Sequence, residues 1–207
     1  MTTIKADERP FLLLLPLSVT LRRLPQVLFG LALFGVGIAM MVVGNLGLGP
    51  WDVFHQGVAD LTGLSIGTVI IGTGAVVVLA FIPLKEQLGL GTILNAIVIG
   101  LAADAALSVL TEPDAFFWRL SYTLAGPVVI ALGSGLYIGG GLGPGPRDGL
   151  MTGLARRGIE VWRARTAIEV VVLIIGLFLG GSIGIGTVWF AVGIGPMVQF
   201  FLPRFTR

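Results

Sequence analysis

The stretch GNLGLGPWD at residues 44–52 recurs 96 positions later as GGLGPGPRD at residues 140–148. Both copies end in the motif Gly-Pro-x-Asp. A second pair follows in the same order at an offset of 95, with GLGT at 89–92 and GIGT at 184–187. Two separate matches at nearly one offset predict an internal repeat, so the chain is interpreted as two tandem halves.

The composition is that of a membrane protein. The 207 residues are 55% hydrophobic and only 12% charged, with a mean hydropathy of +0.98, and the charged share is about half of that in soluble domains. A transmembrane helix needs about 20 mostly apolar residues. Six apolar runs meet or approach this length, at 24–44, 66–84, 92–110, 120–139, 167–183 and 187–203.

These runs predict an all-α membrane protein with six transmembrane helices and a short helix after each Gly-Pro-x-Asp motif. The predicted parts are a cytoplasmic or interfacial lead-in at 1–23, a first three-helix repeat at 24–110 and a second at 120–203. Because three is an odd number, the second repeat enters the membrane from the opposite side. Inverted repeats with Gly/Pro-broken segments are typical of secondary transporters, although channels and proteins with no transport role can also arise by duplication.

The basic residues support this count of crossings. With a cytoplasmic N-terminus, six crossings leave only Arg119 outside, which matches the positive-inside rule. Both termini are then expected in the cytoplasm. The basic residues predicted to lie inside are Lys5, Arg9, Arg22, Arg23, Lys85, Arg147, Arg156, Arg157, Arg163, Arg165, Arg204 and Arg207.

The Gly-Pro-x-Asp motif has the chemistry of a helix start. Glycine permits a tight turn, proline suits the first helical position, and an acidic residue in the first turn complements the helix dipole. In one interpretation each helix begins inside the membrane and points its positive end at a solute cavity, with the Asp as a cation or proton site. In the other, the helix is interfacial and the Asp only caps it. The candidate residues are Gly49, Pro50 and Asp52 in the first copy and Gly145, Pro146 and Asp148 in the second.

Other polar residues within apolar sequence are further candidates for binding a substrate or ion. Asp104 lies in an apolar segment, where a charge usually faces a cavity or a partner, and its counterpart in the second half is Gln199. Asn95 lies on nearly the opposite face of the same helix. His55 follows the first motif on an amphipathic segment. The simpler alternatives are headgroup contact for Asp104 and an interfacial position for His55.

Several classes of site are excluded or not expected. The chain has no cysteine and a single histidine, so thiolate and His-rich metal sites are ruled out. No zinc-protease, phosphate-loop or serine-hydrolase motif is present, and we expect no enzyme activity, cofactor or nucleic-acid partner. Glu169 is expected to pair with Arg165, four residues earlier, in a structural role.

The sequences GNLGLGPWDVFHQG at 44–57 and GLSIGT at 63–68 resemble the YczE-type bacterial membrane proteins, which are related to the YitT group. The similarity runs from about Leu31 to Phe201. It implies a multipass protein of the bacterial plasma (inner) membrane, in a family of which some members are grouped with exporters of small organic compounds. The resemblance carries over no site residues.

The leading hypothesis is a small secondary transporter or exporter of a small organic solute. It would alternate access between outward-facing Asp52, His55 and Asp104 and inward-facing Asp148 and Gln199. The alternatives are a passive channel, or a non-transporting accessory protein that binds a partner through its basic cytoplasmic loop. Six helices enclose only a modest cavity, which favours a homodimer in the lipid bilayer.

Overall fold

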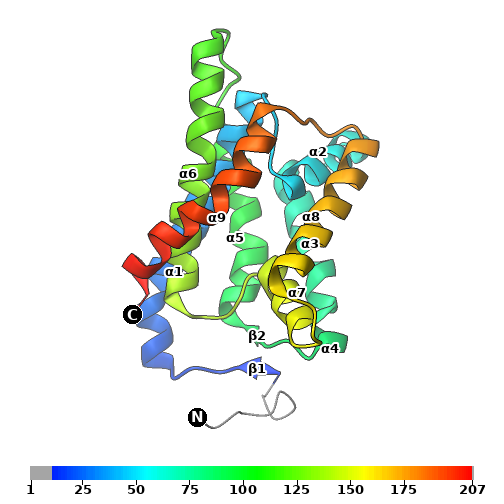
Figure 1. The fold of residues 1–207 in the computed structure, drawn as a ribbon. Coiled ribbons are helices and arrows are strands. Elements are labelled where there is room, and N and C mark those ends of the chain that lie inside the picture. The colour runs from blue at the N-terminus through cyan, green and yellow to red at the C-terminus, as the bar shows by residue number, and fades with distance from the viewer. Residues whose placement is uncertain (1–10, 207) are drawn as a thin grey trace.

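The computed structural model describes residues 11–206, which are mostly helical. Figure 1 shows the arrangement of these elements. In chain order they are β1 (Leu12–Leu13), α1 (Leu17–Gly44), α2 (Pro50–Thr62), α3 (Ile66–Leu79), α4 (Phe81–Leu84), β2 (Leu88–Gly89), α5 (Leu90–Leu107), α6 (Phe116–Gly140), α7 (Pro146–Ala155), α8 (Val161–Phe178) and α9 (Ile185–Phe205).

The expected all-helical membrane protein is confirmed in its main features. Within residues 11–206, five helical stretches are long and apolar enough to cross a membrane. Large apolar side chains such as Val76, Leu101 and Val192 are exposed on them, as expected of a surface that contacts lipid. The five stretches are Leu17–Gly44, Ile66–Leu84, Leu90–Leu107, Phe116–Gly140 and Ile185–Phe205.

The predicted fifth crossing, residues 167–183, corresponds to α8 and is not among these five. The helix starts earlier than expected, at Val161, and its first half carries Arg163, Arg165 and Glu169. Three charges in 18 residues make α8 too polar to qualify as a span by composition. The sixth crossing therefore stays a prediction.

The predicted lead-in at 1–23 differs from the structure in its boundary. Helix α1 begins at Leu17, directly after Pro16, so the second part of the lead-in belongs to the first long helix. Before it, β1 pairs in parallel with β2, with Leu12 opposite Leu88. The rest of the lead-in, residues 1–10 with Lys5 and Arg9, lies outside the described residues, as does Arg207.

Helices α1 and α6 form the central pair and run antiparallel, joined through glycines. A Cβ atom on Gly30 would lie 2.7 Å from the carbonyl oxygen of Gly133, and one on Gly37 would lie 2.8 Å from that of Gly126. Small residues let helix backbones approach closely in a membrane, where packing replaces the hydrophobic effect as the driving force. The other long helices pack around this pair, α5 against α1 and α9 against α6.

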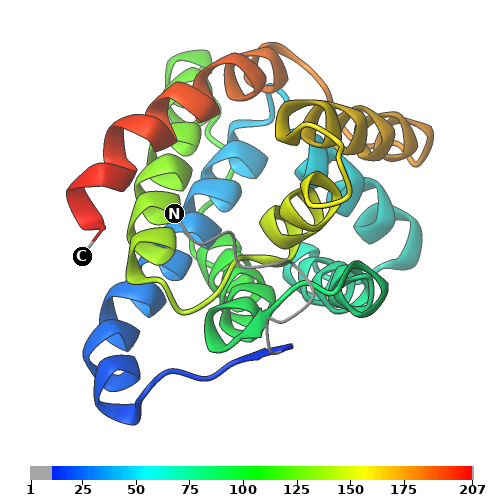
Figure 2. The ribbon, with the colours of Figure 1, turned by 60° about the horizontal axis from the view of Figure 1, so that its bottom comes forward.

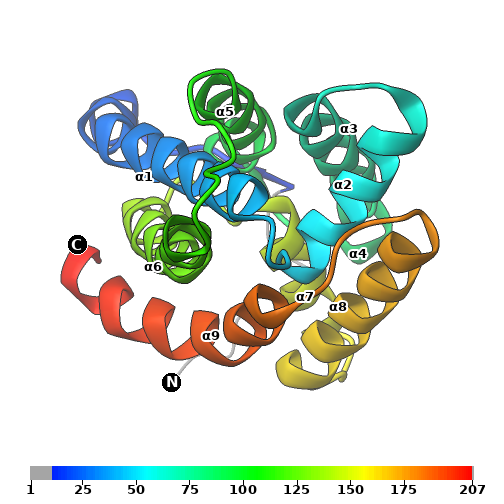
Figure 3. The ribbon, with the colours of Figure 1, turned by 90° about the horizontal axis from the view of Figure 1, so that it is seen from above.

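The two short helices begin inside the protein. Helix α2 begins at Pro50 and α7 at Pro146, and both prolines are buried. Figure 1 shows the chain turning back into the bundle after α1 before α2 begins. In Figures 2 and 3 the longer helices form a ring, and α7 lies within it. With 13 and 10 residues, neither helix is long enough to cross a bilayer.

The two loops that lead into these helices have nearly the same backbone conformation. Gly49 has φ −63° and ψ 155°, and Gly145 has φ −63° and ψ 159°. Two residues earlier, Gly47 (φ 106°) and Gly143 (φ 123°) both lie in the region that favours glycine. The sequence match at 44–52 and 140–148 is therefore also a match in local structure.

Each loop accepts a hydrogen bond from the first turn of the last long helix in the other half of the chain. The backbone N–H of Gly186, at the start of α9, donates to the carbonyl of Leu46 (2.9 Å). The N–H of Gly91, at the start of α5, donates to the carbonyl of Leu142 (2.7 Å). The two hydrogen bonds link equivalent positions, so the halves exchange contacts rather than fold side by side.

We predict that Gly30→Ala destabilises the protein and that Gly72→Ala does not. The added methyl group on Gly30 meets backbone atoms of α6, whereas Gly72 has open space around it. Overpacking of this kind costs about 1–3 kcal/mol, while alanine improves intrinsic helix propensity by up to about 1 kcal/mol. Thermal unfolding of the purified protein in detergent should show a lower midpoint for Gly30→Ala alone. Equal effects of the two substitutions would contradict the close α1–α6 contact.

Candidate functional site

The N-terminal ends of α2 and α7 meet in the middle of the protein. The guanidinium carbon of Arg147 lies 4.9 Å from the centre of the Trp51 ring, and its Nη2 atom lies 3.8 Å from Oδ1 of Asp52. Trp51 and Arg147 occupy the same position of the two Gly-Pro-x-Asp motifs. Both helices therefore point their positive dipole ends toward one region inside the bundle.

The first motif contributes a buried acid–histidine pair. Oδ1 of Asp52 lies 3.2 Å from Nδ1 of His55, one helical turn later, and the two residues are 2% and 1% exposed. The rings of Trp51 and Phe54 flank the imidazole. His55 is thus enclosed by the protein and does not lie on its surface.

The second motif contributes a carboxylate with a different partner. The hydroxyl of Tyr137, on α6, donates a hydrogen bond to Asp148. On the other side of Gly145, the amide of Asn95 reaches the same region, because a Cβ on Gly145 would lie 2.9 Å from Asn95 Nδ2 and 3.0 Å from the Tyr137 hydroxyl. Asn95, Tyr137 and Asp148 therefore form one polar group around the start of α7.

A cavity of about 230 Å³ lies beside this meeting point. Its polar wall contains five charged and two neutral side chains, and the remainder is mostly apolar, including Phe34, Phe190 and Ile194. Buried charges in a membrane protein usually line a cavity or a pathway. The seven polar side chains are Asp52, Ser134, Arg147, Asp148, Arg165, Glu169 and Gln199.

The cavity lies toward the end of the bundle at which α9 ends. It is lined by Ser134 and Ile138 from the second half of α6, by Val198 and Gln199 from the second half of α9, and by the beginning of α8. This end of the bundle is the lower one in Figure 1, where β1 and the C-terminal end of α9 also lie. The wall is thus built mainly from the second half of the chain.

A second, smaller cavity of about 40 Å³ lies on the other side of the meeting point. Its wall includes His55, Asn95 and residues of α3 and α5. Phe34, Trp51 and Arg147 line both cavities, so the stacked Trp51 and Arg147 side chains stand between them. The indole nitrogen of Trp51 is buried and has no hydrogen-bond partner in residues 11–206.

The structure groups the predicted site residues unevenly. Asp52, Asp148 and Gln199 line the larger cavity, whereas His55 and Asn95 line the smaller one. Gly49 lines the larger cavity and Gly145 and Pro146 the smaller, so both helix starts border the site, with Pro50 buried beside them.

Asp104 lies apart from both cavities. Its Oδ1 accepts a hydrogen bond from the backbone N–H of Gly67 (2.7 Å), and its Oδ2 accepts one from the hydroxyl of Ser65 (2.6 Å). The carboxylate therefore binds the N-terminus of α3, where it also meets the positive helix end. It borders a surface depression shared with Asp60.

The predicted pair of Arg165 and Glu169 forms, with 2.9 Å between Nε and Oε1. Its place on the cavity wall was not predicted. A signal was present, because at the repeat offset of 95 these two charges stand where the first half has Ile70 and Gly74. Charges that replace apolar residues in only one half indicate a local function. For Tyr137, which lies in an apolar run, the sequence holds no comparable signal.

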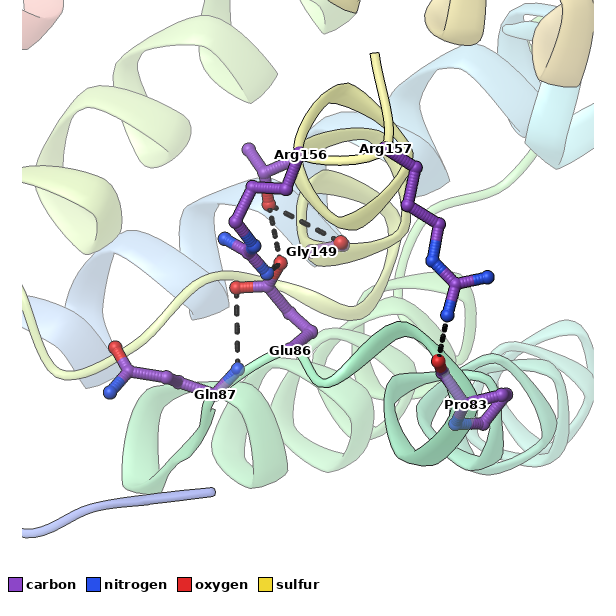
Figure 4. Close-up of polar contacts among 7 residues, drawn as sticks. Pro83, Glu86, Gln87, Gly149, Arg156 and Arg157 are labelled. Atoms are coloured by element: carbon purple, nitrogen blue, oxygen red, sulfur yellow. Dashed lines mark hydrogen bonds and ion pairs between the residues drawn. The ribbon is translucent and has the colours of Figure 1, made fainter. Parts of the chain in front are cut away.

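The far end of α7 is fixed to the hairpin between α4 and β2, as Figure 4 shows. Glu86 is 4% exposed, forms an ion pair with Arg156 and accepts a hydrogen bond from the hydroxyl of Thr152 (3.0 Å). On the other short helix, the side chain of Gln56 accepts a hydrogen bond from the N–H of Ser182 (2.7 Å). Each short helix is thus tied to a loop of the other half.

Comparison with known proteins agrees with the membrane architecture. Residues 21–203 match the model of a family of unknown function, DUF6198. The chain belongs to this family. It is 42% identical over 182 residues to an uncharacterized protein of Haemophilus influenzae (87% of this chain and 84% of that protein) and 32% identical over 179 residues to the uncharacterized membrane protein YczE of Bacillus subtilis (84% and 83%).

A third relative is the uncharacterized protein YyaS of Bacillus subtilis, 27% identical over 186 residues, which are 86% of this chain and 91% of that protein. No solved structure matches the chain. The expected relationship to YczE-type membrane proteins is confirmed. The names of these relatives state no activity, so the function must be inferred from the site.

We predict that Glu86→Gln destabilises the protein more than Glu112→Gln. Both carboxylates pair with arginine, but Glu112 is 50% exposed in its pair with Arg119, and exposed pairs contribute little. Loss of the buried charge at Glu86 weakens hydrogen bonds to a charged group and should cost about 1–3 kcal/mol. Thermal unfolding in detergent measures the difference. A larger effect at Glu112 would contradict the assigned role of Glu86 in fixing α7.

Proposed function

We propose that this protein is a small secondary-type transporter or exporter of a small organic solute. The observation that carries the proposal is the 230 Å³ cavity, lined by five charged side chains, at the point where α2 and α7 begin. Interrupted helices that start inside a membrane protein form the solute sites of many secondary transporters. A cavity with an apolar wall and a few polar groups is also the usual form of a small-molecule site.

The proposal includes a sixth crossing, made by α8. Two of its three charged residues, Arg165 and Glu169, pair with each other and line the cavity. The third, Arg163, lies in the first turn of α8 and pairs with Glu160, which precedes the helix. The packing of α8 also resembles that of the span formed by α3 and α4. A Cβ on Gly57 of α2 would contact Leu179 after α8, and one on Gly153 of α7 would contact Leu84 of α4.

The two halves are then inverted repeats, with both chain ends on the cytoplasmic side. The matched loop conformations and the exchanged hydrogen bonds of Leu46 and Leu142 support this arrangement. The larger cavity, which lies toward the end of the bundle that contains the C-terminal end of α9, faces inward in this topology. Movement of the Trp51–Arg147 contact would connect it with the smaller cavity.

Labelling of single cysteines tests access to the cavity, because the chain has no native cysteine. We expect Met151→Cys, on the cavity wall, to react with a small membrane-impermeant thiol reagent applied from the cytoplasmic side in inside-out vesicles. The control is Ala103→Cys, whose position is fully buried in the core and should not react. Labelling of Met151→Cys only from the opposite side would contradict the proposed topology, and no labelling from either side would contradict a solute cavity.

Transport itself requires a solute, which a growth-sensitivity screen of a deletion strain against many compounds can supply. We expect purified protein in proteoliposomes to accumulate the compound at the expense of an ion gradient, and Arg147→Gln to lower this accumulation at least tenfold because the partition between the cavities is lost. A solute flux that does not depend on ion gradients would indicate a passive channel. If none of the compounds found in the screen moves, the accessory-protein alternative would be favoured over the proposal.

A further inference from the structure

We propose that the larger cavity binds a solute with a positive charge, a small amine or quaternary ammonium compound, and that Asp148 is the residue that pairs with it. This inference rests on the cavity of the proposed function and names the class of its ligand. It depends on the balance of charges in the cavity wall and on the residues that surround Asp148.

Four of the five charged side chains in the wall are already paired. Arg165 and Glu169 form one ion pair (2.9 Å), and Arg147 lies 3.8 Å from Asp52, which also contacts His55. Asp148 is the fifth. Its hydrogen-bond partner is the neutral hydroxyl of Tyr137, and within residues 11–206 no side-chain nitrogen of an arginine, lysine or histidine forms an ion pair with its carboxylate oxygens at 4.0 Å or less. Among the described residues, the wall therefore has one carboxylate without a cationic partner.

The helix dipole alone does not compensate for this charge. The first turn of a helix stabilises a carboxylate only modestly. Removal of a carboxylate from water costs more than this gain. Asp148 is partly buried beside a cavity with many apolar residues, so a cation in the cavity would interact with it more strongly than bulk water allows.

The volume of the larger cavity and the other residues of its wall suit an organic cation. A volume of about 230 Å³ corresponds to roughly eight water molecules at the density of the liquid, which is enough for a compound of a few carbons. The rings of Phe34 and Phe190 line the cavity, and aromatic faces attract ammonium groups. Gln199 and Ser134 supply neutral hydrogen-bonding groups for the rest of the solute.

Equilibrium binding to the purified full chain tests the inference with three probes of nearly one shape. Choline is cationic, neohexanol replaces its nitrogen with carbon and is uncharged, and tert-butylacetate is anionic. Titration calorimetry in detergent should give a Kd for choline at least tenfold lower than that for neohexanol, with tert-butylacetate the weakest. Tetramethylammonium and ethanolamine serve as additional cations.

Substitutions identify the group responsible. Asp148→Asn keeps an acceptor for Tyr137 but removes the charge, and it should raise the Kd for choline at least tenfold while that for neohexanol changes less than twofold. Tyr137→Phe keeps the carboxylate and should keep the preference for cations. The control is Asp114→Asn in the exposed α5–α6 loop, which should leave every Kd unchanged.

The outcomes separate this inference from the proposed function. If none of the three cations binds, if neohexanol binds as tightly as choline, or if Asp148→Asn keeps the preference, the inference is wrong. Cation binding without uptake into proteoliposomes would retain the inference and contradict transport. Uptake of a neutral or anionic compound without cation binding would support transport and contradict the inference of a cation site.

Discussion

The structure depends on a constraint that the bilayer imposes on irregular backbone. Inside a membrane every peptide N–H and C=O needs a partner within the protein, yet the chain turns back into the bundle after α1 and again after α6. The carbonyl groups of Leu46 and Leu142 accept hydrogen bonds from the starts of α9 and α5. With these bonds in place, α2 and α7 can begin deep in the protein, where their first turns border the cavities.

The positions of the glycines follow from the same constraint. Gly47 and Gly143 provide the positive φ angles of the two loops. Gly184 and Gly89 provide the space, since a Cβ on either residue would meet the backbone of the opposing loop. A substitution at such a position disturbs a contact between the halves as well as the conformation of one turn.

Much of this fold can be predicted from the sequence, because helices in a membrane need long apolar runs and these runs account for most of the chain. The motif also predicted where α2 and α7 begin. The site residues were harder to predict from the sequence, because tertiary packing decides which face of a helix meets which neighbour. Asp52, which was predicted to face outward, lines the same cavity as Asp148 and Gln199, which were predicted to face inward, whereas Asp104 binds the start of α3.

Two further differences have local causes. Arg163, Arg165 and Glu169 together make α8 too polar to count as a span by composition, although Arg165 and Glu169 pair with each other on the cavity wall. Tyr137 was overlooked because a tyrosine in an apolar run usually packs as an aromatic residue, and only the position of α7 brings Asp148 to its hydroxyl.

The exchanged hydrogen bonds also set an order of events during synthesis. Leu46 leaves the ribosome 140 residues before Gly186, its partner. At about 5–20 residues per second, this interval is roughly 7–28 seconds. During that time the carbonyl of Leu46 in the first loop has no native partner. Either α2 stays near the membrane surface, where water can hydrate this carbonyl, or the carbonyl accepts a hydrogen bond from another group. The native interior is completed only when the last helix has been inserted.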